Sequence, residues 1–295
     1  MKTAVVTGGS SGIGKETTKA LVSMGYRVII AARNQAKGIA LIETIQQDIP
    51  SANIEFHSVD LSDFSAVKQF CRYLKETLDS LELLVLNAGL FTSKLETNST
   101  GHELMFASTH LGHFLMTHEL MPLMRETMKK ASSSNPYPVR IVVTSSVAHQ
   151  FASFGNFFKT LENPIKNNTF LLIPFINYGR SKLANLLFVR GLASRLKDEA
   201  ILVNGFHPGG VKSDIWRGTP SLFNRIIYPF LVTEKAGAET QIFLATEPKL
   251  NESGQYFCRK KKDFTSPRSR NKKLIDDLWT YSENALNIDS FGLPD

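Results

Sequence analysis

Short apolar runs alternate with longer amphipathic stretches along most of the chain, and this alternation limits the fold more than any other feature of the sequence. Apolar runs bounded by turn residues are typical of buried strands, and stretches with helical periodicity are typical of the helices that cover them. We expect strands at residues 3–7, 26–32, 53–59, 82–87, 139–145, 200–206 and 254–258. We expect helices at residues 13–24, 34–48, 63–80, 102–130, 175–197 and 234–247. The pattern predicts an α/β fold: a single Rossmann-type doubly wound domain with a mostly parallel seven-stranded sheet flanked by helices.

The 295 residues suit one large domain of this class, and the 42% hydrophobic content is ordinary for a protein with a substantial core. We expect this domain to span residues 1–258. Two long insertions interrupt the alternation, at 147–174 and at 210–233, and we interpret the second as a lid over the substrate. Residues 259–295 form a basic extension that we expect to pack on or beside the domain.

The sequence carries few signs of export or membrane insertion. Only Cys71 and Cys258 are present, which predicts neither a disulfide framework nor a metal site. Met1 and Lys2 lead directly into the first predicted strand, and no apolar run reaches the roughly 20 residues that a membrane span needs. We therefore expect no signal peptide and a cytoplasmic protein.

The net charge of +7 is concentrated in one segment, since residues 259–273 hold eight Lys and Arg residues against Asp263 alone. One interpretation is a solvated loop. The other is peripheral contact with an anionic intracellular membrane, where each basic residue near the lipid adds about 1 kcal/mol. No aromatic interleaving or nucleic-acid recognition motif accompanies the charge, so we expect no nucleic-acid partner.

A glycine-rich loop follows the first predicted strand and opens the first predicted helix. Gly8 permits a tight turn, Gly12 lets the backbone approach a pyrophosphate, and Gly14 allows close packing of helix and strand. The helix amino terminus then faces the anion. The predicted cofactor contacts in this loop are Gly8, Ser10, Ser11, Gly12, Ile13 and Gly14.

A second motif places Tyr178 one helical turn before Lys182, so that a phenolic proton donor has an ammonium beside it. Each motif alone matches by chance. Their order and separation together indicate a dinucleotide-dependent reaction.

Through these and further motifs the sequence resembles the short-chain dehydrogenase/reductase family, and more closely its retinol-dehydrogenase-like branch, up to about residue 250. The resemblance rests on the Gly8-x-x-x-Gly12-x-Gly14 loop, Asp60-Leu61, Asn87-Ala88-Gly89, His110-Leu111-Gly112-His113-Phe114, Ser145-Ser146, the Tyr178 to Asn185 run and His207-Pro208-Gly209. Protochlorophyllide reductases and WW-containing oxidoreductases are similar in the branch-level motifs.

The resemblance implies roles for three side chains. Tyr178 is the general acid/base, Lys182 lowers the pKa of Tyr178 and binds the nicotinamide ribose, and Ser146 holds the substrate oxygen. A free phenol has a pKa of about 10, so nearby positive charge is needed for proton exchange near neutrality. Ser145 is expected to be a small packing residue.

Arg33 stands where NAD-dependent dinucleotide folds usually have an acid, at the end of the second strand. A guanidinium suits a 2′-phosphate, and in the resembled branch this residue goes with NADP(H), with Ser10 or Lys15 able to help. The alternative is a solvated Arg that caps a strand.

The resemblance implies further residues that contact the cofactor. Asp60 matches the acid that meets the adenine amino group, and Asn87 supports the adenosine pocket or simply forms a turn. The remaining predicted contacts are Leu61, Ala88, Gly89, Pro208, Gly209, Val211 and Ser213.

The sequence departs from the family at Thr109, where an Asn usually completes a Ser-Asn-Tyr-Lys tetrad and helps to seat a water. A relay through the Thr109 backbone carbonyl is independent of the side chain. His110 and His113 lack a third ligand nearby, so we interpret them as packing or helix-surface residues and expect no metal.

The predicted function is NADP(H)-dependent hydride transfer to or from a small lipophilic carbonyl or alcohol substrate, retinoid-, steroid- or lipid-aldehyde-like. The aromatic content of residues 210–233 favours such a substrate, and residues 222–232 together with 259–273 are the candidates for membrane contact. The alternative, motivated by Thr109, is a catalytically impaired NADP(H)-binding sensor or membrane-associated scaffold. Family members often form homodimers through the helices at 102–130 and 175–197.

Overall fold

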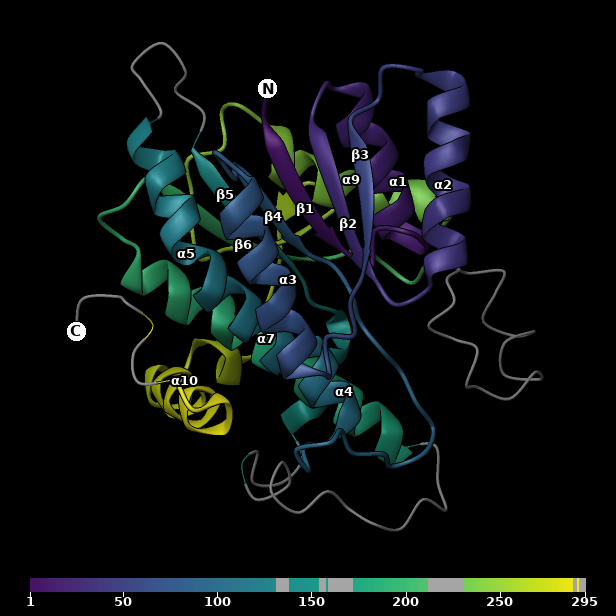
Figure 1. Cartoon of the computed structure of the whole chain (residues 1–295). Helices are drawn as coiled ribbons and strands as arrows, with labels where there is room; N and C mark the ends of the chain where they lie inside the picture. The colour runs from purple at the N-terminus through teal and green to yellow at the C-terminus, as the bar shows by residue number, and fades with distance from the viewer. Residues whose placement is uncertain (131–137, 154–157, 159–171, 212–230, 289–290, 292–295) are drawn as a thin grey trace.

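The computed structural model describes residues 1–130, 138–153, 158, 172–211, 231–288 and 291, and shows one sheet with helices on both faces (Figure 1). The strand order is β3-β2-β1-β4-β5-β6-β7-β8. The strands are β1 (Thr3–Thr7), β2 (Arg27–Ala32), β3 (Ile54–Ser58), β4 (Leu83–Leu86), β5 (Val139–Thr144), β6 (Ile201–His207), β7 (Tyr256–Cys258) and β8 (Lys261–Lys262). This confirms the predicted Rossmann-type α/β fold.

The first seven strands pair in parallel, as predicted, and the eighth pairs antiparallel with β7. The prediction of seven strands missed β8 because it has only two residues, both exposed lysines. The chain reverses into β8 through Arg259 and Lys260, which both have positive φ. Lysine on an edge strand disfavours pairing with another chain.

Two sets of helices bury the two faces of the sheet. The first set consists of α1 (Gly12–Ser23), α2 (Gln35–Asp48) and α9 (Glu234–Thr246), and the second of α3 (Phe64–Thr77), α5 (Gly112–Lys130) and α7 (Leu172–Arg195). Successive strand residues point to opposite faces. Accordingly, Val6 belongs to the core under the first set and Val5 to the core under the second.

The basic extension contains a helix of its own. The short 3₁₀ segment η5 (Pro267–Arg270) leads into α10 (Lys272–Leu286), which packs on α7 beside α5 (Figure 1). Its Trp279 lies edge-on to Phe114 of α5, with ring centroids 5.0 Å apart, and both side chains belong to the same buried core. The extension thus completes the hydrophobic core on this face.

Three short helical segments lie near the carboxyl ends of the strands: α4 (Leu104–Phe106), the π-helical η1 (Ala107–Leu111) and the 3₁₀ segment η2 (Val147–Ser153). The strand order reverses between β1 and β4. In open α/β sheets, ligands bind outside the carboxyl ends of the strands at such a switch point. The topology therefore predicts a ligand site at that edge.

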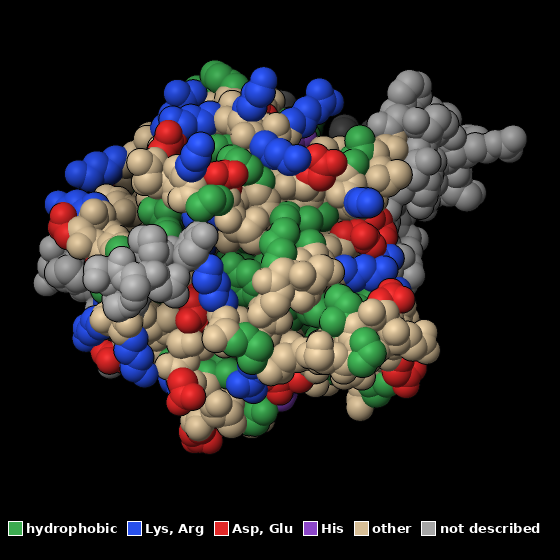
Figure 2. Space-filling model, turned by 90° about the horizontal axis from the view of Figure 1, so that it is seen from above, with side chains coloured by type: hydrophobic (Ala, Val, Ile, Leu, Met, Phe, Trp, Pro, Cys, Tyr) green, Lys and Arg blue, Asp and Glu red, His purple; other side chains and the backbone are tan. Residues whose placement is uncertain are grey.

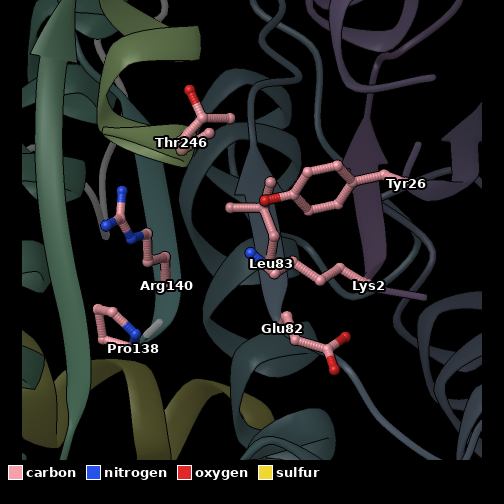
Figure 3. A pocket seen from close by; sticks show the side chains of 8 residues that line it. Lys2, Tyr26, Glu82, Leu83, Pro138, Arg140 and Thr246 are labelled. Atoms are coloured by element: carbon pink, nitrogen blue, oxygen red, sulfur yellow. The ribbon is translucent and has the colours of Figure 1, made fainter. Parts of the chain in front are cut away.

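The opposite edge of the sheet, at the amino-terminal ends of the strands, has a mixed surface and a small pocket. Seen from the amino-terminal ends of the strands, Lys and Arg side chains are interspersed with acidic and apolar ones (Figure 2). A small pocket opens at this end (Figure 3), where Arg140 donates to the carbonyls of Leu244 and Glu247 at the end of α9, and Glu82 accepts from the backbone N–H of Thr3. The Arg140 and Glu82 side chains in this pocket thus stabilise the fold. The pocket is lined by Lys2, Tyr26, Glu82, Leu83, Pro138, Arg140, Ala245 and Thr246.

Candidate active site

The glycine loop (residues 8–14) turns sharply from β1 into α1. Gly8 and Gly12 have φ of 63° and 56°, in the left-handed region that favours glycine. A Cβ on Gly14 would collide with the Gly8 carbonyl oxygen and would lie 2.6 Å from Nδ2 of Asn87. Ser11 precedes the helix in an extended conformation and makes no side-chain capping bond, so the loop leaves the first-turn N–H groups of α1 for an anion. This geometry fits the pyrophosphate of a dinucleotide.

Asn87, directly after β4, and Thr7, at the end of β1, hold this loop in place. Nδ2 of Asn87 donates to the Thr7 carbonyl at 3.0 Å and lies 3.5 Å from that of Gly8. Oγ1 of Thr7 accepts from the backbone N–H groups of Asn87 and Ala88. Oγ1 of Thr7 is also 2.9 Å from Nε2 of the fully buried His113. Asn87 therefore acts on the loop itself, in agreement with the turn alternative for this residue.

The two serines after β5 differ in their contacts. Oγ of Ser145 is buried and donates to the Lys182 carbonyl at 2.8 Å, as suits a packing residue. Oγ of Ser146 accepts from the Ala148 N–H at 3.2 Å and lies near enough to Tyr178 to lower the pKa of the phenol. The structure thus brings Ser146, and not Ser145, beside the phenol.

Tyr178 and Lys182 lie on the same face of α7 at this edge. Nζ of Lys182 lies 5.5 Å from the centroid of the Tyr178 ring and donates to the Thr144 carbonyl at 3.2 Å. Asn185 donates to the same carbonyl at 3.1 Å. A Cβ on Gly89 would lie 3.1 Å from Nζ of Lys182, so only glycine leaves that ammonium open toward the loop after β4.

Burial dominates the protonation of this pair. It raises the pKa of Tyr178, while the hydrogen bond from Ser146 lowers it. It also lowers the pKa of Lys182 to about 7. Lys182 is buried and its ammonium is directed to the Thr144 carbonyl, whereas Tyr178 is partly exposed, and the lowering of the Tyr178 pKa by Lys182 stays a prediction.

Thr109 lies in the π-helical segment η1, fully buried, beside this group. Its carbonyl oxygen is 2.9 Å from Nδ1 of His113, and its Oγ1 is 3.5 Å from the Leu90 N–H. π-Helical turns frequently occur at functional sites.

The cations predicted for a 2′-phosphate have different surroundings. Arg33 follows β2 with an exposed side chain. Lys15 forms an ion pair with Glu234 at 2.9 Å, and that bond raises its pKa. Lys15 is therefore already neutralised, whereas no salt bridge within the described chain engages Arg33. Ser10 is buried within the loop.

Asp60 and the turn after β6 also lie where the sequence predicted a site. Oδ1 of Asp60 accepts from both the N–H and the hydroxyl of Ser62, and Leu61 is buried. Gly209 follows Pro208 with φ of 88°. Val211 is buried. A Cβ on Gly237 of α9 would collide with Val211 and would lie 3.4 Å from Ile13. Ser213 and most of the predicted lid lie outside the described residues.

Gln241 is a buried residue of the site that no sequence pattern indicated. Its amide nitrogen is 3.3 Å from Oδ1 of Asn87 and from Oγ1 of Thr144, and its oxygen accepts from Thr17 at 2.6 Å. The residue on α9 thereby links α1 with the ends of β4 and β5. Only its place in a helical pattern was visible in the sequence, and that pattern does not show which face is polar and buried.

His110 and His113 are occupied as protein-packing groups. Nε2 of His110 is 2.9 Å from Oγ of Ser282 on α10, and burial lowers the pKa of each histidine to about 3. Among the described residues, no three His, Cys, Asp or Glu side chains are placed to hold a metal ion.

Comparison with known proteins agrees with this geometry. The short chain dehydrogenase family matches residues 2–157. The chain is 36% identical to retinol dehydrogenase 12 of Bos taurus over 290 residues, which cover 97% of this chain and 87% of the relative. It is 32% identical to retinol dehydrogenase 14 of Mus musculus, with coverage of 97% and 86%. The chain belongs to the short-chain dehydrogenase family. Within the family it lies in the retinol-dehydrogenase-like branch.

Comparison with solved structures agrees with the fold. An uncharacterised protein from Mycobacterium paratuberculosis superimposes with a TM-score of 0.74 at 25% identity, over 97% of this chain and 94% of that one. The Pseudomonas aeruginosa RhlG/NADP active-site complex gives a TM-score of 0.65 at 25% identity, over 86% and 93%. The protein is thus a short-chain oxidoreductase of alcohol or carbonyl groups that uses a nicotinamide cofactor.

The basic segment at 259–273 is partly neutralised by acidic neighbours. Lys260 pairs with Glu239, Lys262 with Glu252 and Lys273 with Asp277, at 2.9, 2.6 and 2.7 Å. The local excess of positive charge is therefore smaller than the sequence suggests. No helix in the described part of the chain has the length and apolar character needed to cross a membrane.

Proposed function

We propose that this short-chain dehydrogenase is an NADP(H)-dependent reductase of lipophilic aldehydes or ketones, and the corresponding alcohol dehydrogenase in reverse. The observation that carries the proposal is the placement of Ser146, Tyr178 and Lys182 together beside the glycine loop, at the switch point of the sheet. The bound cofactor would supply or accept the hydride. The residues of the chain would orient the substrate and move the proton.

In the reducing direction, Tyr178 gives the phenolic proton to the oxygen of the substrate carbonyl. A pKa raised by burial keeps that proton on the phenol at neutral pH. The Ser146 hydroxyl, close to the phenol, would hold the same substrate oxygen. The Thr144 carbonyl holds the ammonium of Lys182 near both the phenol and the loop after β4.

An aromatic group beside Tyr178 favours a lipophilic substrate. The Phe91 ring stands edge-on to Tyr178 at 5.9 Å and lies 5.1 Å from the Phe175 ring. Val147 and Phe151, which follow Ser146 in η2, are 44% and 56% exposed. Apolar surface next to a catalytic group binds apolar substrate. The names of the relatives, retinol dehydrogenases 12 and 14, support the same substrate class.

NADP(H) is the cofactor we propose, on two grounds. Arg33 presents an exposed guanidinium at the end of β2, where the 2′-phosphate of the adenosine ribose would bind. The structurally similar RhlG was solved with NADP.

Oxidation of NADPH and of NADH, measured against a panel of retinoid, steroid and lipid aldehydes and ketones, tests the proposal. We expect turnover with NADPH and at least one lipophilic carbonyl. Tyr178→Phe should lower kcat by about 10²- to 10⁴-fold, the usual contribution of general acid catalysis, with an unchanged Kd for NADPH. A Tyr178→Phe variant that retains most of its activity would contradict the assignment of the proton donor.

A further inference from the structure

His149 occupies the space between the catalytic serine and the carboxyl-terminal extension. It lies in η2, three residues after Ser146, and its side chain is fully buried. Nδ1 is 2.6 Å from the Ser146 carbonyl oxygen, which also accepts from the His149 backbone N–H at 3.1 Å. Nε2 accepts from the backbone N–H of Ser266 at 3.2 Å.

These two bonds define one form of the imidazole. A carbonyl oxygen only accepts, so Nδ1 carries the proton, and an N–H only donates, so Nε2 is unprotonated. His149 is therefore neutral and makes one bond through each nitrogen. Burial lowers its pKa and favours the same neutral form, with the Ser146 carbonyl and Asp263 acting in the opposite direction and Arg190 in the same direction.

Residues 265–270, which we name the 265–270 segment, bind both elements that carry catalytic groups. Arg190 of α7 donates to the hydroxyls of Thr265 and Ser269, at 2.9 and 3.1 Å. The Ser266 carbonyl accepts from both the N–H and the hydroxyl of Ser269. Thr265, Ser266 and Ser269 are all buried. The segment is thus a fixed part of the core and not a loose tail.

We propose that His149 is a positioning residue through which the 265–270 segment holds Ser146 beside Tyr178. The inference rests on the proposed function, because it assigns His149 to the placement of a catalytic hydroxyl. Ser146 is held through its own carbonyl by His149, while its Oγ accepts from Ala148 and lies near enough to Tyr178 to lower the pKa of the phenol. Loss of the Ser266 bond would free the imidazole and leave the Ser146 carbonyl with the His149 backbone N–H alone.

The backbone of Ser266 allows the bond to be removed by one substitution. Its φ of −58° and ψ of 147° are values that proline adopts, and the next residue is Pro267. Ser266→Pro removes the N–H that donates to His149 and puts the proline Cδ in its place, so the imidazole must also move away. Ser266→Ala keeps that N–H and removes only a hydroxyl that has no hydrogen-bond partner among the described residues, so it is the matched control.

We expect Ser266→Pro to lower kcat roughly three- to tenfold relative to Ser266→Ala, which is the usual worth of one hydrogen bond expressed as a rate. The Kd for NADPH should be equal in the two variants. At the other end of the bond, His149→Gln keeps an amide oxygen near the position of Nε2 and should retain more activity than His149→Leu. Equal kcat in Ser266→Pro and Ser266→Ala, or parallel losses in kcat and in NADPH affinity, would overturn the proposal.

Hydrogen–deuterium exchange separates this proposal from the proposed function. The peptide spanning residues 145–152 should exchange faster in Ser266→Pro than in Ser266→Ala, whether or not any carbonyl is turned over. Equal exchange would overturn the role of His149. Full activity of Tyr178→Phe together with faster exchange would instead overturn the proposed chemistry and leave the link between the 265–270 segment and Ser146 intact.

Discussion

The glycine loop and the catalytic group formed by Ser146, Tyr178 and Lys182 lie at the same edge of the sheet but are held by different means. The loop is fixed by backbone conformation and close contact, with two left-handed glycines and no room for a Cβ on Gly14. The catalytic group is fixed by single hydrogen bonds to buried partners.

This difference implies a division between binding and turnover. A change in the loop should alter the affinity for the cofactor, because the loop has no group that takes part in proton transfer. A change among the partners of the catalytic side chains should alter kcat and leave that affinity alone. Lys182 tests the limit of this division, since it bonds to Thr144 and also faces Gly89.

Lys182→Met should produce the largest effect of the four predictions. It removes a cation that adjoins both Tyr178 and the loop after β4, so both kcat and the affinity for NADPH should fall. We expect a loss in kcat of about 100-fold or more, as for other groups that support proton transfer. Stopped-flow turnover and fluorescence titration of NADPH measure the two quantities. Unchanged NADPH affinity would place Lys182 with the catalytic group alone.

Gly14→Ala should weaken cofactor binding by roughly tenfold or more, because forcing a methyl group into a packed site costs about 1–3 kcal/mol. The added Cβ meets the Gly8 carbonyl and Nδ2 of Asn87, so the loop must shift. At saturating NADPH, kcat should stay close to that of the wild type. Thermal unfolding serves as the control for a general loss of structure. A fall in kcat without a change in Kd would contradict the division.

Arg33→Ala should weaken NADPH binding about tenfold and leave NADH binding nearly unchanged, because a charged hydrogen bond contributes about 1.5–3 kcal/mol. Lys68→Ala, at another exposed cation, controls for the loss of one positive charge. Equal losses for both cofactors would make Arg33 a structural residue. The Arg33 variant thus tests the choice between NADPH and NADH alone.

Acid should destabilise both regions through their buried histidines. His113 supports the glycine loop and His110 binds α10, and the pKa of each is about 3 in the folded protein against 6.5 in an unfolded chain. Their contribution to stability is present above pH 6.5 and is lost as the pH falls toward 3, because the unfolded state binds the protons.

The slope should be at most about 1.4 kcal/mol per pH unit for each histidine. Urea unfolding between pH 7.5 and pH 5 measures this slope. His110→Phe should lower by one the number of protons that unfolding takes up. A slope that is the same in the variant and the wild type would show that His110 is solvated.

Sequence patterns predicted the parts of the site that depend on local geometry. The turn at Gly8, the position of Ser146 before η2, and the one-turn spacing of Tyr178 and Lys182 all follow from residues that are close in the chain. The retinol-dehydrogenase-like branch was also recognisable from short motifs. The hydrogen bond of Lys182 to the Thr144 carbonyl was not visible in a spacing, and the effect of Lys182 on the Tyr178 pKa stays a prediction.

The supports of the site could not be predicted, because they come from distant parts of the chain. Gln241 reaches Asn87 across 154 residues, and Ser266 reaches His149 across 117. A lone Gln in a helix or a Ser before a Pro has no distinguishing pattern. Their partners are decided by the packing of α9 and the 265–270 segment against the sheet.

The position of α10 has a consequence for assembly. Homodimers of this family were predicted to join through the helices that became α5 and α7, yet Trp279 of α10 already lies on Phe114 of α5, and its indole stacks parallel to Phe188 of α7. Leu278 and Leu286 are buried in the same core. The chain thus covers this apolar surface of α5 and α7 with its own carboxyl-terminal part. A second copy that used this surface would first have to displace α10 and expose the aromatic side chains beneath it.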